Sequence, residues 1–225
     1  SSDLMDDCVF EAYVTNLGKY NEGALVGEWV KFPTTPEEMQ EVFKRIGINA
    51  QYEEYFITDY DMDIHGLYDQ LGEYESLDKL NYLAGRLDEM SLYERKCFDA
   101  ILESGLDIPG DGLVAYINLT YNLDKYEIYS GIMDEADLGR YWVEEGGYDT
   151  KAMGVLADYI DYEAFGRDIQ MNENGMFTDA GYVRDNESSW DEYFNGELDD
   201  IPDEYRLGSA LEEARSASKE QVIEA

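Results

Sequence analysis

The sequence predicts an α+β protein made of several small domains, and three observations support this prediction. Loose apolar–polar alternation on both sides of a turn-rich segment near the N-terminus predicts two strands joined as a hairpin. Apolar residues at helical spacing, preceded by capping residues, follow in several places. The chain has 225 residues, of which 44% are hydrophobic and 14% aromatic, so it can bury a sizeable core and form one to three domains.

The first predicted domain, residues 8–63, contains a small antiparallel sheet. Residues 8–14 and 26–32 are expected to be the two strands of the hairpin, because both alternate loosely between apolar and polar side chains. The residues between them, 16–23, include Asn and Gly at positions typical of turns. The sequence therefore predicts a hairpin with a long connecting loop.

A helix and a third strand complete this domain. Thr35 before Pro36 predicts a helix start, because proline fits the first helical position and threonine caps it. Gly47 predicts the end of that helix. Residues 52–60 predict the third strand, with odd- and even-numbered side chains on opposite faces.

The next segment, residues 64–112, predicts a helical middle domain. One helix is expected to begin after Ser76 and to carry a stripe of leucines. Ser91 with Glu94 forms a capping box that predicts a second helix. Glycines, aspartates and one proline in residues 105–112 predict a break.

Residues 113–183 predict a C-terminal α+β domain. Strands are expected at 113–123 and 176–183, and helices at 133–143 and 155–165. The second helix is expected to end at Gly166, with Leu156, Ile160 and Ala164 on its inner face.

The last 42 residues, 184–225, form an acidic C-terminal extension with 13 acidic and 4 basic residues. Its aromatic side chains predict partial order, and residues 209–225 predict a short, mostly polar helix.

The net charge limits the possible partners of this protein. The chain carries 52 acidic and 16 basic residues, a formal charge of -36 with a pI near 4.1, far beyond what solubility needs. Nucleic acid and anionic membranes are excluded as partners, since both require cationic contacts. We expect a basic partner: a cation, a basic peptide, or a protein surface that normally holds nucleic acid.

The densest acidic stretch lies between Ile46 and Asp78. It holds nine carboxylates and no Lys or Arg, interleaved with six aromatic residues. Because disordered acidic segments have few aromatics, we expect a folded element with an apolar underside and like charge above it. Such charge destabilises its own fold, so an external partner is expected to require it. A charge of -36 corresponds to about 18 base pairs of duplex DNA.

No catalytic, cofactor or metal site is predicted. Asp59, Asp61 and Asp63 have calcium-loop spacing, but Ile64 and Gln70 stand where such a loop needs Gly and Glu, so only weak, adventitious cation binding is expected. The single histidine lies near no nucleophile motif. Carboxylate pairs suited to glycoside chemistry remain open, because 52 acidic residues offer many of them.

The expected location is the cytoplasm. No apolar run approaches the length of a membrane span, and the first residues lack a signal peptide. Cys8 and Cys97 fit no metal or redox spacing and are expected to be thiols in a reducing compartment.

Several stretches of the sequence resemble the ArdA family of antirestriction proteins. The first block is Tyr-Val-Thr-Asn-Leu-Gly-Lys-Tyr-Asn-Glu-Gly at residues 13–23, continuing to Phe32-Pro33. Residues 47–60, 140–147 and 159–168 are also similar. The resemblance covers about residues 8–183, and the extension from Arg184 has no counterpart in it.

The resemblance implies an elongated, three-domain, non-enzymatic protein that mimics bent B-form DNA. It implies a homodimer formed through the C-terminal domain, and the DNA-binding groove of type I restriction–modification enzymes as the target. Tyr141, Trp142 and Val143 are the expected dimer surface. The carboxylates expected to replace DNA phosphates are Glu53, Glu54, Asp59, Asp61, Asp63, Glu73, Glu75, Asp78, Asp158, Asp161, Glu163 and Asp168.

Two other functions stay open at this point. One is a cation-binding domain or a hydrolase that uses a carboxylate pair, which would act catalytically and depend on single residues. The other is an acidic adaptor for a basic protein, which would be a compact monomer.

Overall fold

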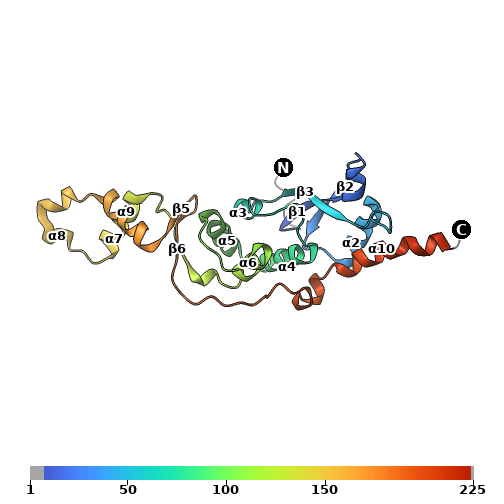
Figure 1. The fold of residues 1–225 in the computed structure, drawn as a ribbon. Coiled ribbons are helices and arrows are strands. Elements are labelled where there is room, and N and C mark those ends of the chain that lie inside the picture. The colour runs from blue at the N-terminus through green and yellow to red at the C-terminus, as the bar shows by residue number, and fades with distance from the viewer. Residues whose placement is uncertain (1–7, 224–225) are drawn as a thin grey trace. The chain divides into compact units, whose positions relative to one another are not determined.

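A computed structural model describes residues 8–223 as backbone and residues 8–216 with their side chains. Within that range there are ten α-helices and two three-stranded antiparallel sheets (Figure 1), so the predicted α+β class is confirmed. The contacts divide the chain into two compact units. Unit 1 comprises the residues up to Leu92, Pro109–Tyr121, and the residues from Glu192 onward; unit 2 comprises Tyr93–Ile108 and Asn122–Asp191.

The sheet of unit 1 has the order β2-β1-β3. Strands β1 (Phe10–Asn16) and β2 (Gly27–Phe32) pair antiparallel, which confirms the predicted hairpin. The connection contains a feature that was not predicted, the short helix α1 (Leu17–Asn21). The Asn16 side chain caps this helix by accepting a hydrogen bond from the Lys19 amide at 3.0 Å.

The third strand, β3 (Tyr55–Asp61), pairs antiparallel with β1 but does not alternate as predicted. Ile57 pairs with Val14 and Asp59 with Tyr13, so Thr58 is one extra residue in the ladder. Such a bulge shifts the side chains from one face to the other. Phe56 and Ile57, which precede the bulge and lie on opposite faces of the strand, are both buried.

Helix α2 (Pro36–Ile46) confirms its predicted caps. The Thr35 hydroxyl accepts a hydrogen bond from the Glu38 amide, and the helix ends at Gly47, whose φ of 79° favours glycine. Its apolar stripe is buried in unit 1.

Helices α4 (Leu77–Asp88) and α5 (Leu92–Ser104) confirm the two helices predicted for the middle of the chain. The Ser76 hydroxyl accepts a hydrogen bond from the Lys79 amide at the start of α4. A short helix, α3 (His65–Tyr68), precedes them.

The strand predicted for residues 113–123 is wrong, because most of that stretch forms helix α6 (Gly112–Leu119). Short apolar runs do not distinguish a strand from a helix that is buried on most of its surface. Helix α6 is of the second kind, and it packs against α4. A 3-10 turn, η1 (Leu123–Lys125), follows it.

The C-terminal part of unit 1 contains two 3-10 turns and a long helix. These are η3 (Leu198–Asp200), η4 (Asp203–Tyr205) and α10 (Gly208–Ile223). The helix predicted for residues 209–225 is therefore confirmed as far as Ile223, and its last two positions lie outside the described residues. Helix α10 lies beside α2 (Figure 1).

The sheet of unit 2 has the order β4-β6-β5. Its strands are β4 (Tyr126–Tyr129), β5 (Met176–Thr178) and β6 (Gly181–Asp185). The single strand predicted for residues 176–183 is wrong, because the chain reverses between β5 and β6 and the two pair antiparallel. Strand β4 was not predicted.

Helix α7 (Glu135–Glu145) confirms the helix predicted for residues 133–143. It begins at Asp134, whose carboxylate accepts a hydrogen bond from the Asp137 amide at 2.8 Å. Helix α8 (Thr150–Met153) follows.

The helix predicted for residues 155–165 is wrong. Residues Gly154–Tyr159 form the 3-10 segment η2, and a new helix, α9 (Tyr162–Glu173), begins after Asp161. Leu156, expected on an inner face, is 68% exposed. Gly166, expected to end the helix, lies inside α9.

No helix within the described residues is long and apolar enough to cross a membrane. The predicted domain boundaries after residues 63, 112 and 183, and the elongated three-domain arrangement, stay predictions.

Candidate functional site

The carboxylates predicted to act together fall into two groups, one in each unit. Ten of the twelve side chains are exposed, while Glu75 and Asp78 are partly buried. Unit 1 holds those from Glu53 to Asp78, and unit 2 holds those from Asp158 to Asp168.

In unit 1, the acidic residues lie on β3, on the segments that flank it, on the loop that follows α3 and in the first turn of α4. The Ile57 amide donates a hydrogen bond to the Glu73 carbonyl at 2.8 Å, and the Tyr60 hydroxyl donates to the Gly72 carbonyl at 2.7 Å. These bonds hold the loop against β3. The carboxylates of Glu73 and Glu75 therefore belong to the same part of unit 1 as those of Asp59 and Asp61.

The aromatic residues of this stretch form only part of the predicted underside: Phe56 is buried, whereas Tyr68 and Tyr74 are 46% and 73% exposed. The Phe56 ring lies 5.0 Å from that of Tyr20 and 6.2 Å from that of Tyr74, measured between centroids. Burial raises the pKa of Tyr55 and that of Tyr60, and the charge of Glu75 raises the pKa of Tyr60 further. Both phenols are therefore neutral donors at neutral pH.

Three of these carboxylates accept hydrogen bonds from backbone amides of unit 1. Glu75 accepts from the Gly72 amide and Asp59 from the Tyr60 amide. Asp78 accepts from the amides of Leu207 and Gly208. Asp78 is therefore engaged in holding the fold of unit 1.

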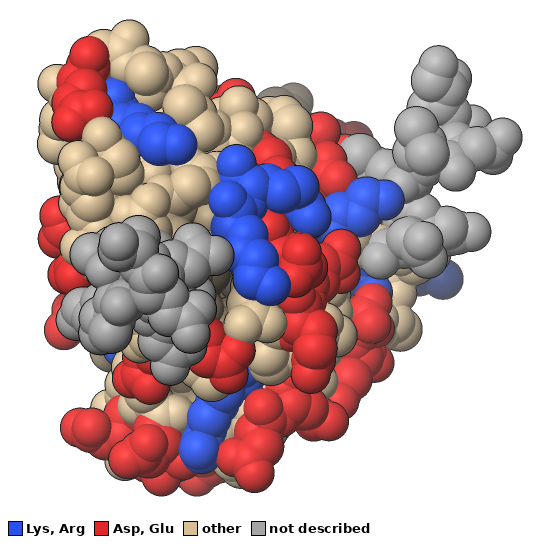
Figure 2. Space-filling view, turned by 90° about the vertical axis from the view of Figure 1, so that its right-hand side faces the viewer, with Lys and Arg blue, Asp and Glu red and all other residues tan. Residues whose placement is uncertain are grey.

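The surface of unit 1 is not uniformly acidic. Lys and Arg side chains gather among carboxylates on the face drawn in Figure 2. Arg215 of α10 lines two hollows of about 270 and 350 Å³, and Glu54 borders both. The cation therefore lies beside part of the predicted acidic surface.

In unit 2, the predicted carboxylates lie on η2, at the start of α9 and on α9 itself. Asp158 lies on η2, and Asp161 caps α9 by accepting from the Ala164 amide. Glu163 is paired with Arg167 at 2.7 Å, while Asp168 is exposed on the same helix. Each of these four side chains is exposed.

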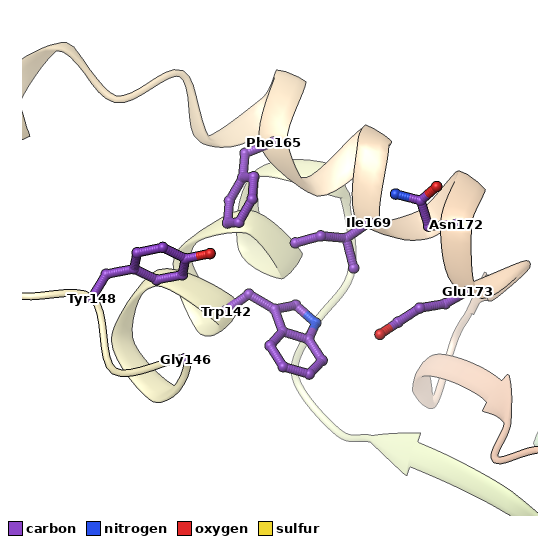
Figure 3. Close-up of a pocket in the computed structure, with 7 residues that line it drawn as sticks. All are labelled: Trp142, Gly146, Tyr148, Phe165, Ile169, Asn172 and Glu173. Carbon is purple, nitrogen blue, oxygen red and sulfur yellow. The ribbon is translucent and has the colours of Figure 1, made fainter.

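The three residues predicted for a dimer surface lie on α7, partly inside unit 2. Val143 is buried, and the Tyr141 ring lies 5.3 Å from that of Tyr129. Trp142 lines a hollow of about 350 Å³, into which Tyr148, Phe165 and Ile169 also point (Figure 3).

Sequence reasoning missed two features of unit 2. The first is the exposure of Val155, Leu156 and Tyr159 on the 3-10 segment η2, by 75%, 68% and 82% of their surface. The second is the Arg184 side chain, which binds Glu127 at 2.5 Å and Glu173 at 2.6 Å. These ion pairs could not be predicted from the sequence, because their partners are far apart in it.

The described residues contain no group of three or more His, Cys, Asp or Glu side chains that could hold a metal ion. His65, at the start of α3, is exposed. Asp59 and Asp61 lie in β3 rather than in a calcium-binding loop.

A comparison with protein families decides the identity of the chain. The family model of ArdA antirestriction proteins matches residues 12–184. The chain belongs to the ArdA family. Comparison with curated proteins gave no match. Members of the ArdA family are non-enzymatic DNA mimics that inhibit type I restriction–modification enzymes, which confirms the resemblance seen in the sequence. The match ends at Arg184, so most of the C-terminal extension lies outside the family region.

Proposed function

We propose that exposed carboxylates of both units replace DNA phosphates in the DNA-binding groove of a type I restriction–modification enzyme. The observation that carries this proposal is the exposure of ten of the twelve predicted side chains in a chain of charge -36. Lys and Arg that normally contact phosphates would contact these carboxylates instead.

The proposed mechanism is competitive and electrostatic. A groove that binds duplex DNA attracts a surface of similar charge density, so encounter should be fast at low salt and slower when salt screens the attraction. A protein surface of this kind offers no base edges to read. It should therefore inhibit a class of enzymes rather than one that recognises a particular DNA sequence.

We also propose a homodimer of elongated, three-domain subunits with boundaries after residues 63, 112 and 183. A dimer would carry the charge of about 36 base pairs of DNA. The incomplete burial of Tyr141 and Trp142 supports α7 as part of the dimer surface. Val143 would support that surface from within unit 2.

The test is a titration of the protein into a type I enzyme bound to labelled duplex DNA, at two salt concentrations. We expect displacement of DNA at near-stoichiometric protein, with a weaker effect at high salt. Absence of displacement at low salt, where attraction is strongest, would overturn the proposal for that enzyme. A nuclease that does not bind DNA in a groove of this kind serves as the specificity control.

A further inference from the structure

The residues after the family region fold back onto unit 1, and their apolar side chains enter its core. Phe194, Ile201 and Leu207 are 1%, 0% and 2% exposed, and Ala210 and Ala214 of α10 are also buried. Apolar burial of this extent is typical of residues that belong to a domain core. The acidic composition of the extension gives no indication that these five residues are buried.

Two buried asparagines of unit 1 bind the backbone of this segment. The Asn118 side chain accepts from the amides of Tyr193 and Phe194 at 2.8 and 2.9 Å, and donates to the Phe194 carbonyl at 2.7 Å. The Asn81 side chain donates to the Tyr205 carbonyl at 3.0 Å. Buried polar groups that lose such partners are costly, so these bonds stabilise the segment in its place on unit 1.

The start of α10 is held by a carboxylate of α4. One oxygen of Asp78 accepts from the Leu207 amide at 2.6 Å and from the Gly208 amide at 3.1 Å. A negative charge at a helix N-terminus is stabilising. Asp78 therefore joins two helices whose sequence positions are about 130 residues apart.

Aromatic rings complete the attachment. Tyr82 of α4 contacts Phe194 and Tyr205, with ring centroids 5.6 and 5.7 Å apart. The Tyr121 ring stacks on that of Tyr193 at 4.6 Å. Gly85 leaves room for the Tyr205 ring, which a side chain at that position would overlap.

The far end of the segment reaches the acidic stretch of unit 1. Helix α10 packs against α2, where Gln40 and Glu213 are hydrogen-bonded. The Arg215 Nε donates to the Glu53 carbonyl at 2.8 Å. Arg215 is thus attached to the backbone of the loop that carries Glu53 and Glu54.

We propose that residues 192–216 form a strap that completes the core of unit 1, and that Arg215 is a positioning residue for the loop carrying Glu53 and Glu54. The first part concerns folding alone. The second part rests on the proposed function, because it concerns carboxylates that would contact the target enzyme.

The first part is tested with two strap variants of the full chain. Ile201→Ala removes a side chain that is fully buried, whereas Leu198→Ala on the same strap removes one that is 49% exposed. Amide hydrogen exchange of α4 and α6 is the measurement. We expect Ile201→Ala to speed exchange in both helices at least about threefold, because it loosens the strap whose Tyr205 and Phe194 bind α4 and α6 and so lowers the free energy of opening. Leu198→Ala should leave the exchange unchanged. Faster exchange confined to residues 192–216, or no change, would overturn the strap.

A cut chain gives a second measurement that does not depend on a destabilising variant. A protease site placed at the exposed residues 187–189 allows the strap to be separated from the rest of the chain. We expect the C-terminal fragment that contains the strap to stay bound after cleavage, at high salt as well as low. Its release under both conditions would contradict a strap held by core packing.

The second part is tested by comparing Arg215→Gln with Lys44→Gln. Both variants remove one positive charge, and Lys44 of α2 is paired only at the surface, with Glu41. If only the net charge matters, both variants should have the same small effect on inhibition. The positioning role predicts faster exchange of the amides in residues 50–54 and about threefold weaker inhibition for Arg215→Gln alone, which corresponds to the loss of one hydrogen bond.

The outcomes separate the two proposals. If the unaltered protein displaces DNA and Arg215→Gln behaves as Lys44→Gln in both measurements, the positioning role is wrong and the proposed function stands. If the unaltered protein fails to displace DNA while exchange in residues 50–54 rises only in Arg215→Gln, the proposed function is wrong and the contact remains structural.

Discussion

Gly139 of α7 and Gly166 of α9 face each other where the two helices of unit 2 cross. A Cβ at Gly166 would lie 2.8 Å from the Gly139 amide nitrogen and would overlap the Glu135 carbonyl. A Cβ at Gly139 would overlap the Tyr162 carbonyl. The absence of side chains at both positions lets the two backbones touch.

Gly166→Ala should therefore destabilise unit 2, by about 1–3 kcal/mol, because the backbones must move apart. Met171→Ala is the matched control, since Met171 lies on the same helix and is 65% exposed. Chemical denaturation followed by near-ultraviolet circular dichroism measures both. A cost for Gly166→Ala no larger than that of Met171→Ala would contradict the close crossing.

Glu127 should give unit 2 a specific dependence on pH. A hydrogen bond from the Tyr129 hydroxyl, followed by the bond from Arg184, lowers the pKa of Glu127 from its ordinary value of 4.5. A carboxylate with a lowered pKa in the folded state contributes stability above the unfolded value, and this contribution is lost as the pH falls through the folded value.

The variant Glu127→Gln should therefore be less stable than the unaltered protein at pH 7, by about 0.5–1 kcal/mol because solvent screens a side chain that is 40% exposed, and this difference should shrink towards pH 3. Acid also reduces the repulsion among the carboxylates of the whole chain. This effect is the same in both proteins, so it cancels when their free energies of unfolding are compared. Asp179→Asn, at an exposed position of unit 2, is the control. A difference that stays constant between pH 7 and pH 3 would disprove the role of this carboxylate.

Inhibition should depend on groups of carboxylates rather than on one. Reversing three charges on and next to β3, with Asp59→Lys, Asp61→Lys and Asp63→Lys, should weaken DNA displacement markedly and reduce its salt dependence. Asp59→Asn alone should change it less than about twofold, as expected for one exposed charge. A large loss from the single change would indicate a discrete site.

A second triple charge reversal, on the strap, tests whether inhibition depends on the carboxylates around β3 or on the net charge alone. Glu197→Lys, Asp199→Lys and Asp200→Lys change the net charge equally at exposed positions of the strap. We expect a smaller loss of inhibition than for the β3 variant. Equal losses would mean that total charge governs the interaction and that β3 has no special role.

The dimer surface can be located by two substitutions in unit 2. If the predicted residues on α7 form it, Trp142→Ala should shift the protein towards monomers in sedimentation measurements, whereas Leu156→Ser should not. The opposite result would place the surface at the exposed apolar residues of η2. Circular dichroism of both variants controls for loss of folding.

Local signals in the sequence predicted much of the fold. Helix α2 was bounded correctly because Thr35, Pro36 and Gly47 act on their own neighbours. Helix α6 was taken for a strand because its burial comes from packing against α4, which no local pattern reports. The bulge at Thr58 has the same origin, since it exists only in the pairing of β3 with β1.

The candidate site was predictable in composition but not in detail. Clustering of acids with aromatics around β3 correctly indicated a folded element, but of the aromatics only Phe56 is buried, and Tyr68 and Tyr74 are exposed. The engagement of Asp78 by Leu207 and Gly208, and the approach of Arg215 to Glu53, could not be predicted, because each joins residues more than 120 positions apart. Asp78 looks like any other member of the acidic stretch until its partners are known.

The path of the chain through the two units has a consequence for synthesis on the ribosome. The chain leaves unit 1 after Leu92, returns at Pro109, leaves again after Tyr121 and returns at Glu192. The first unit to emerge is therefore the last to be finished, since α4 and α6 must wait for Phe194 and Tyr205. Contacts between such distant residues form slowly, and until they form, the ring of Tyr82 lacks the contacts with Phe194 and Tyr205 that cover it in the folded chain.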